Sequence, residues 1–249
     1  MAKVNSLIKI EGTLDGLTFY KGKDGYLVRT KGGVSKNRIE NDPAFARTRE
    51  NGLEFGHCAT MGKWLRQALT TLVSDAKDRS MVSRLSQTLS KVKNTDLTSA
   101  RGYRLVPIGL ESDEGKALLK AFDFNSNAIL TSVLLQDLAL NTTTGEISID
   151  NLVPSQHISV PSGATHVSFT AAVLNLNLNT NEKDLQVSPI VNIPINNTVT
   201  SVNTIPAAMP TGDGNVFYLF KISFFQEINT VQYPLNNGAF NVLHIVEIL

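Results

Sequence analysis

The stretch from Asn41 to Leu69, "NDPAFARTRENGLEFGHCATMGKWLRQAL", has the pattern of one long helix and decides the organisation of the N-terminal half. Asp42 and Pro43 predict its start, because an aspartate accepts hydrogen bonds from free N–H groups and a proline at the first helical position loses none. Apolar and small residues then recur every three or four positions on one face: Phe45, Thr48, Gly52, Phe55, Ala59, Gly62, Leu65, Leu69 and Val73.

Each glycine on this face costs about 1 kcal/mol of helix stability relative to alanine. Because glycine has no side chain, it lets another backbone approach closely, so these glycines predict close packing. Met61 and Trp64 point nearly the opposite way, so we expect two partners. One is a second helix within "DRSMVSRLSQTLSKVKN" (78–94), which carries its own apolar stripe. The other is a second copy of the chain. Arg66 interrupts the first face and needs a partner or a bend. The candidate self-association residues are Phe45, Gly52, Phe55, Ala59, Met61, Gly62 and Trp64.

Residues 4–34 have the pattern of a β-meander. The segments "SLIKIEG", "LTFYKG" and "GYLVRTKGG" alternate like strands, and the pairs Asp15-Gly16 and Asp24-Gly25 are typical of two-residue turns. Three short strands with few large apolar residues are marginally stable alone, so we expect this meander to lie on something else.

From about Phe122 onward, helical periodicity gives way to β-branched and aromatic runs separated by Asn, Thr, Gly and Pro. Many short strands without a βαβ rhythm predict an antiparallel β-sandwich. The fold class is therefore α+β, with an N-terminal β-meander and helical hairpin followed by a C-terminal antiparallel β-sandwich. The final strand must be paired or covered, or it becomes an adhesive edge. The predicted strands include "AILTSVLLQDLAL", "EISID", "HISV", "THVSFTAAVLNLN", "DLQVSPIVNIP", "NVFYLFKISFFQEI", "VQYPL" and "FNVLHIVEIL".

The net charge of +1 conceals an uneven distribution along the chain. Residues 1–110 hold 19 Lys/Arg and 10 Asp/Glu, whereas residues 111–249 hold 4 and 12. We therefore predict two domains, a basic β-meander plus helical hairpin (1–110) and an acidic β-sandwich (111–249). Such a division favours contact with a polyanion or mutual attraction between copies.

Three stretches resemble an uncharacterised bacterial family, a domain of unknown function associated with the Bacteroidota. They are "GTLDGLTFYKGKDGYLVRTKGGVS", "NDPAFARTRENGLEFG" and "EINTVQYPLNNGAFNVL". They span most of the chain, so the resemblance implies a single undivided type of protein. It brings no activity, cofactor or catalytic residue.

The sequence lacks the motifs of the common catalytic and metal sites. It contains no P-loop, dinucleotide fingerprint, nucleophile elbow, HExxH pair or EF-hand loop. His57 and Cys58 are neighbours on a helix and point about 100° apart, so they do not form a dyad. His157 and His166 flank a turn-rich segment but have no third metal ligand at an obvious spacing. We predict no catalytic residue, metal, cofactor or small-molecule substrate, and no enzymatic activity.

Lys77, Arg84 and Lys91 recur every seven residues along the second helix. This spacing places them on one edge, as a candidate contact for a polyanion or an acidic partner. Acidic residues interleave with them and no DNA-binding motif occurs, so we favour a protein contact or a solvated face over nucleic acid.

These features predict a non-enzymatic structural protein that self-associates into a homo-oligomer, as a phage-like, mobile-element or appendage component. Head-to-tail contacts between copies would produce rings or filaments. The alternatives are a nucleic-acid-binding accessory protein and a carbohydrate- or surface-binding sandwich. No long apolar run and no signal-peptide pattern occur, so we expect cytoplasmic synthesis without membrane insertion, compatible with incorporation into a particle or an appendage.

Overall fold

The structure is a computed structural model and describes residues 2–4, 9–23, 25–30, 32–120 and 122–249. Its helices and antiparallel sheets confirm the α+β class. The chain divides into two compact units, Met1–Arg49 and Glu50–Leu249, rather than after residue 110 as the charge distribution suggested. Leu110 lies inside an apolar core that the helices share with the C-terminal sheet, which explains the difference.

The N-terminal unit contains a four-stranded antiparallel sheet in the order β1-β4-β3-β2, formed by β1 (Ala2–Lys3), β2 (Gly12–Leu14), β3 (Leu17–Gly22) and β4 (Gly25–Thr30). Asp15 and Gly16 have φ values of 50° and 77°, which confirms the predicted turn between β2 and β3. The strand predicted from "SLIKIEG" is wrong where the structure describes it, because the described strand starts only at Gly12. Residues 6–8 and Asp24 of the second predicted turn lie outside the described residues.

Two short helical segments precede the long helix: α1 (Lys36–Asn41) and the 3-10 turn η1 (Pro43–Phe45). Asp42 caps this turn as predicted, since its Oδ1 accepts a hydrogen bond from the Ala44 N–H at 2.9 Å. The long helix itself is α2 (Ala46–Ala68), and α4 (Met81–Val92) is the predicted second helix. The remaining helical segments of this part are α3 (Thr70–Val73), η2 (Lys93–Thr95), α5 (Val106–Gly109) and α6 (Asp113–Lys120).

The large C-terminal sheet is built on two long strands, β7 (His166–Leu176) and β11 (Asn215–Ile228), which pair along the whole length of β7. On the other side of β11 lie β12 (Val231–Pro234) and β13 (Val242–Ile248). On the other side of β7 lie β8 (Lys183–Val187) and β9 (Val191–Pro194). The final strand is therefore paired.

A smaller antiparallel sheet has the order β10-β6-β5, from β10 (Thr200–Thr204), β6 (Glu146–Leu152) and β5 (Ala139–Asn141). Short helical segments connect the strands: α7 (Leu130–Val133), α8 (Pro154–His157) and η3 (Leu235–Gly238). The strands predicted at "AILTSVLLQDLAL" and "HISV" are therefore largely wrong, since α7 occupies part of the first and α8 reaches into the second. Short apolar runs do not by themselves distinguish a strand from a buried helical turn.

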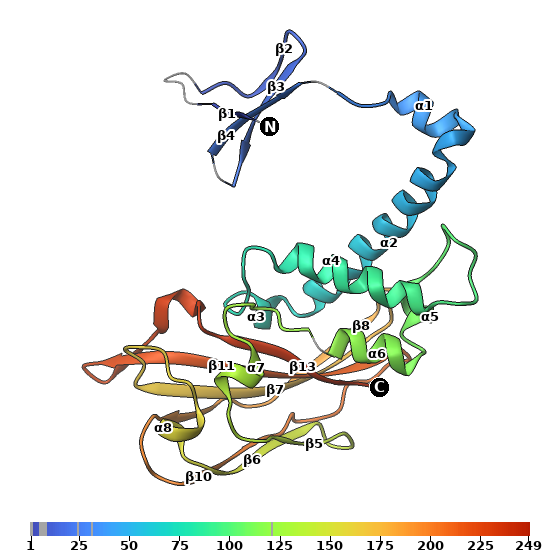
Figure 1. Cartoon of the computed structure of the whole chain (residues 1–249). Helices are drawn as coiled ribbons and strands as arrows, with labels where there is room; N and C mark the ends of the chain where they lie inside the picture. The colour runs from blue at the N-terminus through green and yellow to red at the C-terminus, as the bar shows by residue number, and fades with distance from the viewer. Residues whose placement is uncertain (1, 5–8, 24, 31, 121) are drawn as a thin grey trace. The chain divides into compact units, whose positions relative to one another are not determined.

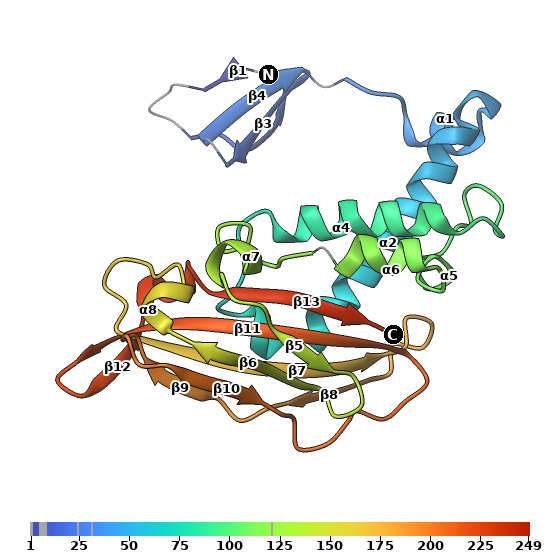
Figure 2. The same ribbon diagram turned by 60° about the horizontal axis from the view of Figure 1, so that its bottom comes forward.

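Within the C-terminal unit, the helices α2, α4 and α6 cover one face of the large sheet and the small sheet covers the other (Figures 1 and 2). Alternation along β7 produces both interfaces, because successive side chains of a strand point to opposite faces. The first core lies between the helices and the large sheet, and it includes Leu174 and Leu176 of β7. The second core lies between the two sheets, and it includes Val167 and Phe169 of β7. The predicted β-sandwich is thus confirmed, with an added helical layer.

Candidate interaction surface on the helical layer

An open groove of about 530 Å³ runs between α2 and α4. Phe55 and Ala59 line it from α2, and Phe55 is 62% exposed. The side from α4 carries one apolar residue, one arginine and several uncharged polar residues: Val82, Arg84, Ser83, Ser86, Gln87 and Ser90. The groove therefore offers an exposed aromatic ring in a largely uncharged setting.

At Val82 the groove meets a second hollow of about 480 Å³, whose lining is more basic. Arg66, Lys77 and Arg79 contribute three cations there against the single carboxylate of Asp78. Arg66, which interrupts the apolar face of the helix, donates from its Nε to the Gly62 carbonyl at 3.1 Å. The helical layer thus has two hollows that share Val82, one with the exposed Phe55 and one with a more basic lining.

Five of the candidate self-association residues remain at least partly accessible: Phe45, Gly52, Phe55, Ala59 and Trp64. Phe55 and Ala59 line the groove, and Gly52 is exposed with no atom within 4 Å of a Cβ added to it. Phe45 is half-buried in the N-terminal unit, where the Arg38 guanidinium lies 5.6 Å from its ring centre. Their part in self-association stays a prediction.

The structure contradicts a contact role for two others. Met61 is buried in the first core, and Gly62 is buried against α4, where a Cβ added to it would lie 3.3 Å from Leu89 Cδ1. The close approach that this glycine permits is therefore to α4 of the same chain. Trp64 is half-buried and packs against the same core.

Arg84 is an internal clamp rather than part of a basic patch. It pairs with Asp78, and it donates to the carbonyl oxygens of Asp123 (2.8 Å) and Phe124 (3.1 Å). Burial raises the pKa of Asp78, but hydrogen bonds from Ser80, Ser126 and Arg84 outweigh this effect and hold the pKa well below its ordinary value. The arginine holds the chain around residues 123 and 124 against α4.

Lys77 and Lys91 are both exposed but do not share a hollow with each other. Lys77 belongs to the basic end of the surface described above. Lys91 lines a different hollow of about 420 Å³ together with Glu114 and Leu118 of α6. The predicted seven-residue row of cations is therefore divided among three environments.

Beneath the surface, Glu54 forms a buried charge cluster that sequence reasoning missed. Its side chain is 2% exposed, pairs with Lys93, and accepts hydrogen bonds from Arg104 Nε (3.0 Å) and the Gly102 N–H (2.8 Å). Burial raises the pKa of Glu54, yet these donors prevail and lower it to about 2. The partners lie 39 to 50 residues away along the chain, so no local sequence pattern predicts these contacts.

Asp96 organises the loop between η2 and α5. Its carboxylate accepts from the N–H groups of Thr98 (3.0 Å), Ser99 (2.9 Å) and Leu105 (2.9 Å). His57 Nε2 accepts from the N–H of Val106, the first residue of α5, at 3.0 Å, so the histidine holds the end of this loop. Burial lowers the pKa of His57, which favours the neutral ring that this acceptor role requires.

The remaining histidines and the cysteine have separate surroundings. His157 Nδ1 accepts from the Val153 N–H at 3.2 Å, and His166 Nε2 lies 3.5 Å from Glu227 Oε2. His244 Nδ1 lies 2.8 Å from Asp123 Oδ1, and Cys58 is buried in the first core, where burial raises the pKa of its thiol. Among the described residues, no three His, Cys, Asp or Glu side chains are grouped to hold a metal ion.

These features define an α+β protein of two units, with open apolar and charged surfaces. Comparison with protein-family models, with curated proteins and with solved structures finds no significant match. The resemblance to a Bacteroidota family of unknown function stays a prediction. In the part of the chain that the structure describes, no helix has the length and apolar character needed to cross a membrane.

Proposed function

We propose that this chain is a non-enzymatic structural protein that self-associates into a homo-oligomer. One observation carries the proposal: none of the described residues between 2 and 49 is buried. A stable domain normally encloses apolar side chains, and a small unit without such a core needs another source of stability. A second copy of the chain supplies it without any additional kind of molecule.

The register of the N-terminal sheet gathers several of its apolar side chains on one side. Paired residues of antiparallel strands share a face, so the pairs Phe19–Val28 and Leu14–Leu17 lie together with Tyr26. Leu14 is 62% exposed. An open apolar face of this kind is a common property of protein-binding surfaces.

The charges of the two units favour contact between copies. Residues 1–49 hold 10 Lys/Arg and 5 Asp/Glu, whereas residues 50–249 hold 13 and 17. Opposite net charges accelerate association and select its orientation. A head-to-tail contact repeated from copy to copy produces a ring or a filament. A phage-like, mobile-element or appendage component would have these properties.

Light scattering with negative-stain microscopy of the full chain, over a range of protein and salt concentrations, tests the proposal. We expect discrete particles or filaments that dissociate as added salt screens the charges. A monomer that persists at high protein concentration and low salt would contradict it.

The alternative function is nucleic-acid binding through the exposed basic residues. A fluorescent oligonucleotide distinguishes it, because binding through phosphates falls steeply with salt and weakens when a contacting lysine is neutralised. Tight oligonucleotide binding that is lost in Lys77→Gln or Lys91→Gln, by a protein that stays monomeric, would favour that alternative.

A further inference from the structure

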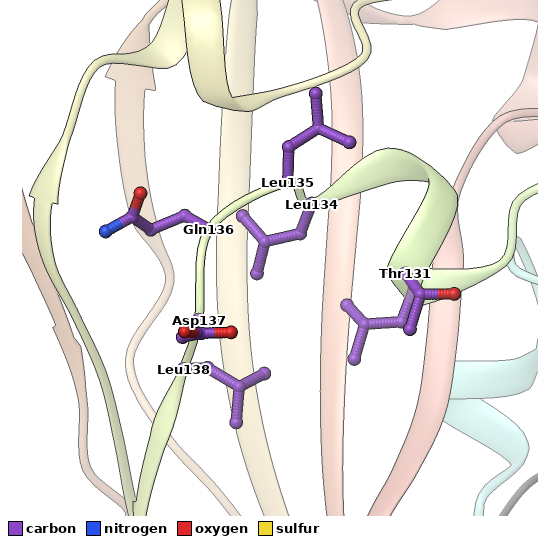
Figure 3. A pocket seen from close by; sticks show the side chains of 7 residues that line it. Thr131, Leu134, Leu135, Gln136, Asp137 and Leu138 are labelled. Carbon is purple, nitrogen blue, oxygen red and sulfur yellow. The ribbon is translucent and has the colours of Figure 1, made fainter.

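Building on the proposed self-association, we infer that the apolar face of the N-terminal sheet of one copy docks on an acidic, leucine-lined hollow at residues 130–138 of a second copy. The hollow measures about 470 Å³ and lies where α7 leads into β5 (Figure 3). Its lining consists of Leu130, Thr131, Leu134, Leu135, Gln136, Asp137 and Leu138.

The hollow is held in place by the core beneath it. Leu130 and Leu134 are buried in the second core, and the Leu135 N–H donates to the His157 carbonyl at 2.8 Å. Gln136 Nε2 donates to the Asp150 carbonyl at 3.2 Å. Leu135 is nevertheless 63% exposed. A fixed backbone that presents a leucine to solvent loses little entropy when a partner covers it.

Its charge distinguishes this hollow from the basic hollow on the helical layer as the docking site for the N-terminal sheet. Among the described residues that line it, Asp137 carries the charge, and it is exposed. The hollow at the end of the α2–α4 groove carries Arg66, Lys77 and Arg79, which would repel a basic partner. Attraction across an apolar contact favours the acidic hollow for the N-terminal unit.

The N-terminal sheet has the complementary features. Lys21 pairs with Tyr26 across β3 and β4, and Lys9 Nζ lies 4.8 Å from the centre of the Tyr26 ring, so two lysines accompany the apolar face. A shallow hollow of about 450 Å³ occurs on this sheet, lined by Ala2, Leu17, Val28, Arg29 and Thr30. It offers a position for the exposed Leu135 of the other copy.

The size of the face indicates a weak individual contact. A six-residue strand is about 20 Å long and neighbouring strands lie about 4.8 Å apart, so the face covers roughly 300 Å². About 600 Å² buried in total lies below the size of most stable interfaces. Repetition of the contact around a ring or along a filament supplies the missing affinity.

Disulfide trapping between two variants tests the contact. Leu14→Cys and Leu135→Cys are prepared as separate full-length proteins and mixed under mild oxidant. We expect a mixed disulfide dimer at least fivefold above that formed by Leu14→Cys with Leu97→Cys, a control at a 91% exposed position outside the hollow. The native Cys58 is buried and contributes no background.

Charge exchange provides the second test. Asp137→Lys is expected to weaken self-association roughly threefold to tenfold, as for a partly exposed ion pair turned repulsive. Lys21→Glu should weaken it similarly, and mixing the two variants should restore association. Asp213→Lys, which alters another exposed acidic residue of the C-terminal unit, is the matched control.

These outcomes separate the inference from the function on which it rests. If the wild-type chain self-associates while Asp137→Lys behaves like Asp213→Lys and cysteine trapping shows no preference for Leu135, the docking site is refuted and self-association stands. If the wild-type chain is monomeric at every concentration, the proposed function fails first. A disulfide that forms only within a chain carrying both cysteines would place the contact inside one copy and overturn the inference.

Discussion

Glu54 Oε1 on α2 accepts a hydrogen bond from the backbone N–H of Gly102 at 2.8 Å, across 48 residues of sequence. The same carboxylate pairs with Lys93 and Arg104. One buried side chain therefore joins α2, η2 and the loop before α5. This arrangement leads to two predictions about stability.

The first concerns loss of the carboxylate. Glu54→Ala leaves the Lys93 ammonium buried without its partner, and breaking a buried pair in this way typically costs about 3–5 kcal/mol. We expect a loss of that size in the free energy of unfolding, measured with urea. Glu111→Gln removes an exposed carboxylate and should change stability by less than about 0.5 kcal/mol. Equal stabilities of the two variants would show that the cluster contributes little.

The second concerns pH. The pKa of Glu54 is lowered from 4.5 to about 2, so its charged form stabilises the fold above pH 4.5, and this stabilisation is lost as pH falls from 4.5 toward 2. The shift corresponds to roughly 3 kcal/mol. Urea unfolding at pH 7, 4 and 3 should show a smaller decline for Glu54→Gln than for the wild type. Parallel declines would contradict the assignment.

A third prediction compares two glycines in helices. A Cβ on Gly52 meets no atom within 4 Å, so Gly52→Ala should stabilise the fold by about 1 kcal/mol. A Cβ on Gly115 would meet a backbone carbonyl oxygen, that of Gly109, so close that the backbone must move. Gly115→Ala should therefore lower the thermal midpoint while Gly52→Ala raises it. The same sign for both would be inconsistent with this packing.

A fourth prediction separates Arg84 from the exposed lysines. Arg84→Ala removes the ion pair with Asp78 and the side-chain donor to two backbone carbonyls, and we expect a loss of about 2–4 kcal/mol in unfolding free energy. Lys77→Ala and Lys91→Ala remove solvated charges and should stay within about 0.5 kcal/mol of the wild type. Denaturant unfolding of the three variants decides whether Arg84 is a structural residue.

A fifth prediction addresses the groove between α2 and α4 as an additional surface for self-association. Burying a phenylalanine contributes about 1.5–3 kcal/mol, so Phe55→Asp should weaken association by at least about tenfold, measured by light scattering. Leu97→Asp places the same charge at an exposed position outside the groove. If both variants associate like the wild type, the groove has no part in assembly, whatever the N-terminal sheet does.

Local patterns were the most predictable part of this protein. The stripe Met81, Leu85, Leu89 and Val92 on α4 is buried as its helical spacing indicates, and β11 coincides with the predicted strand 215–228. Patterns without such regularity gave wrong predictions. Part of the leucine run after Ile129, predicted as a strand, is a helical turn. Here burial in the second core decides between two conformations that the same apolar residues allow.

By itself the sequence determined the α+β class, the turn at Asp15-Gly16, the cap at Asp42 and the uneven distribution of charge, because each depends on neighbouring residues or on composition. Only the tertiary structure decided that Met61 is buried in the first core, that Gly62 packs against α4 of the same chain, that Arg84 is a clamp, and that the chain divides into its two units between Arg49 and Glu50. It also brought Glu54 to partners 39 to 50 residues away. Such contacts join segments that are distant in the sequence, so they depend on the packing of the whole chain rather than on any one segment.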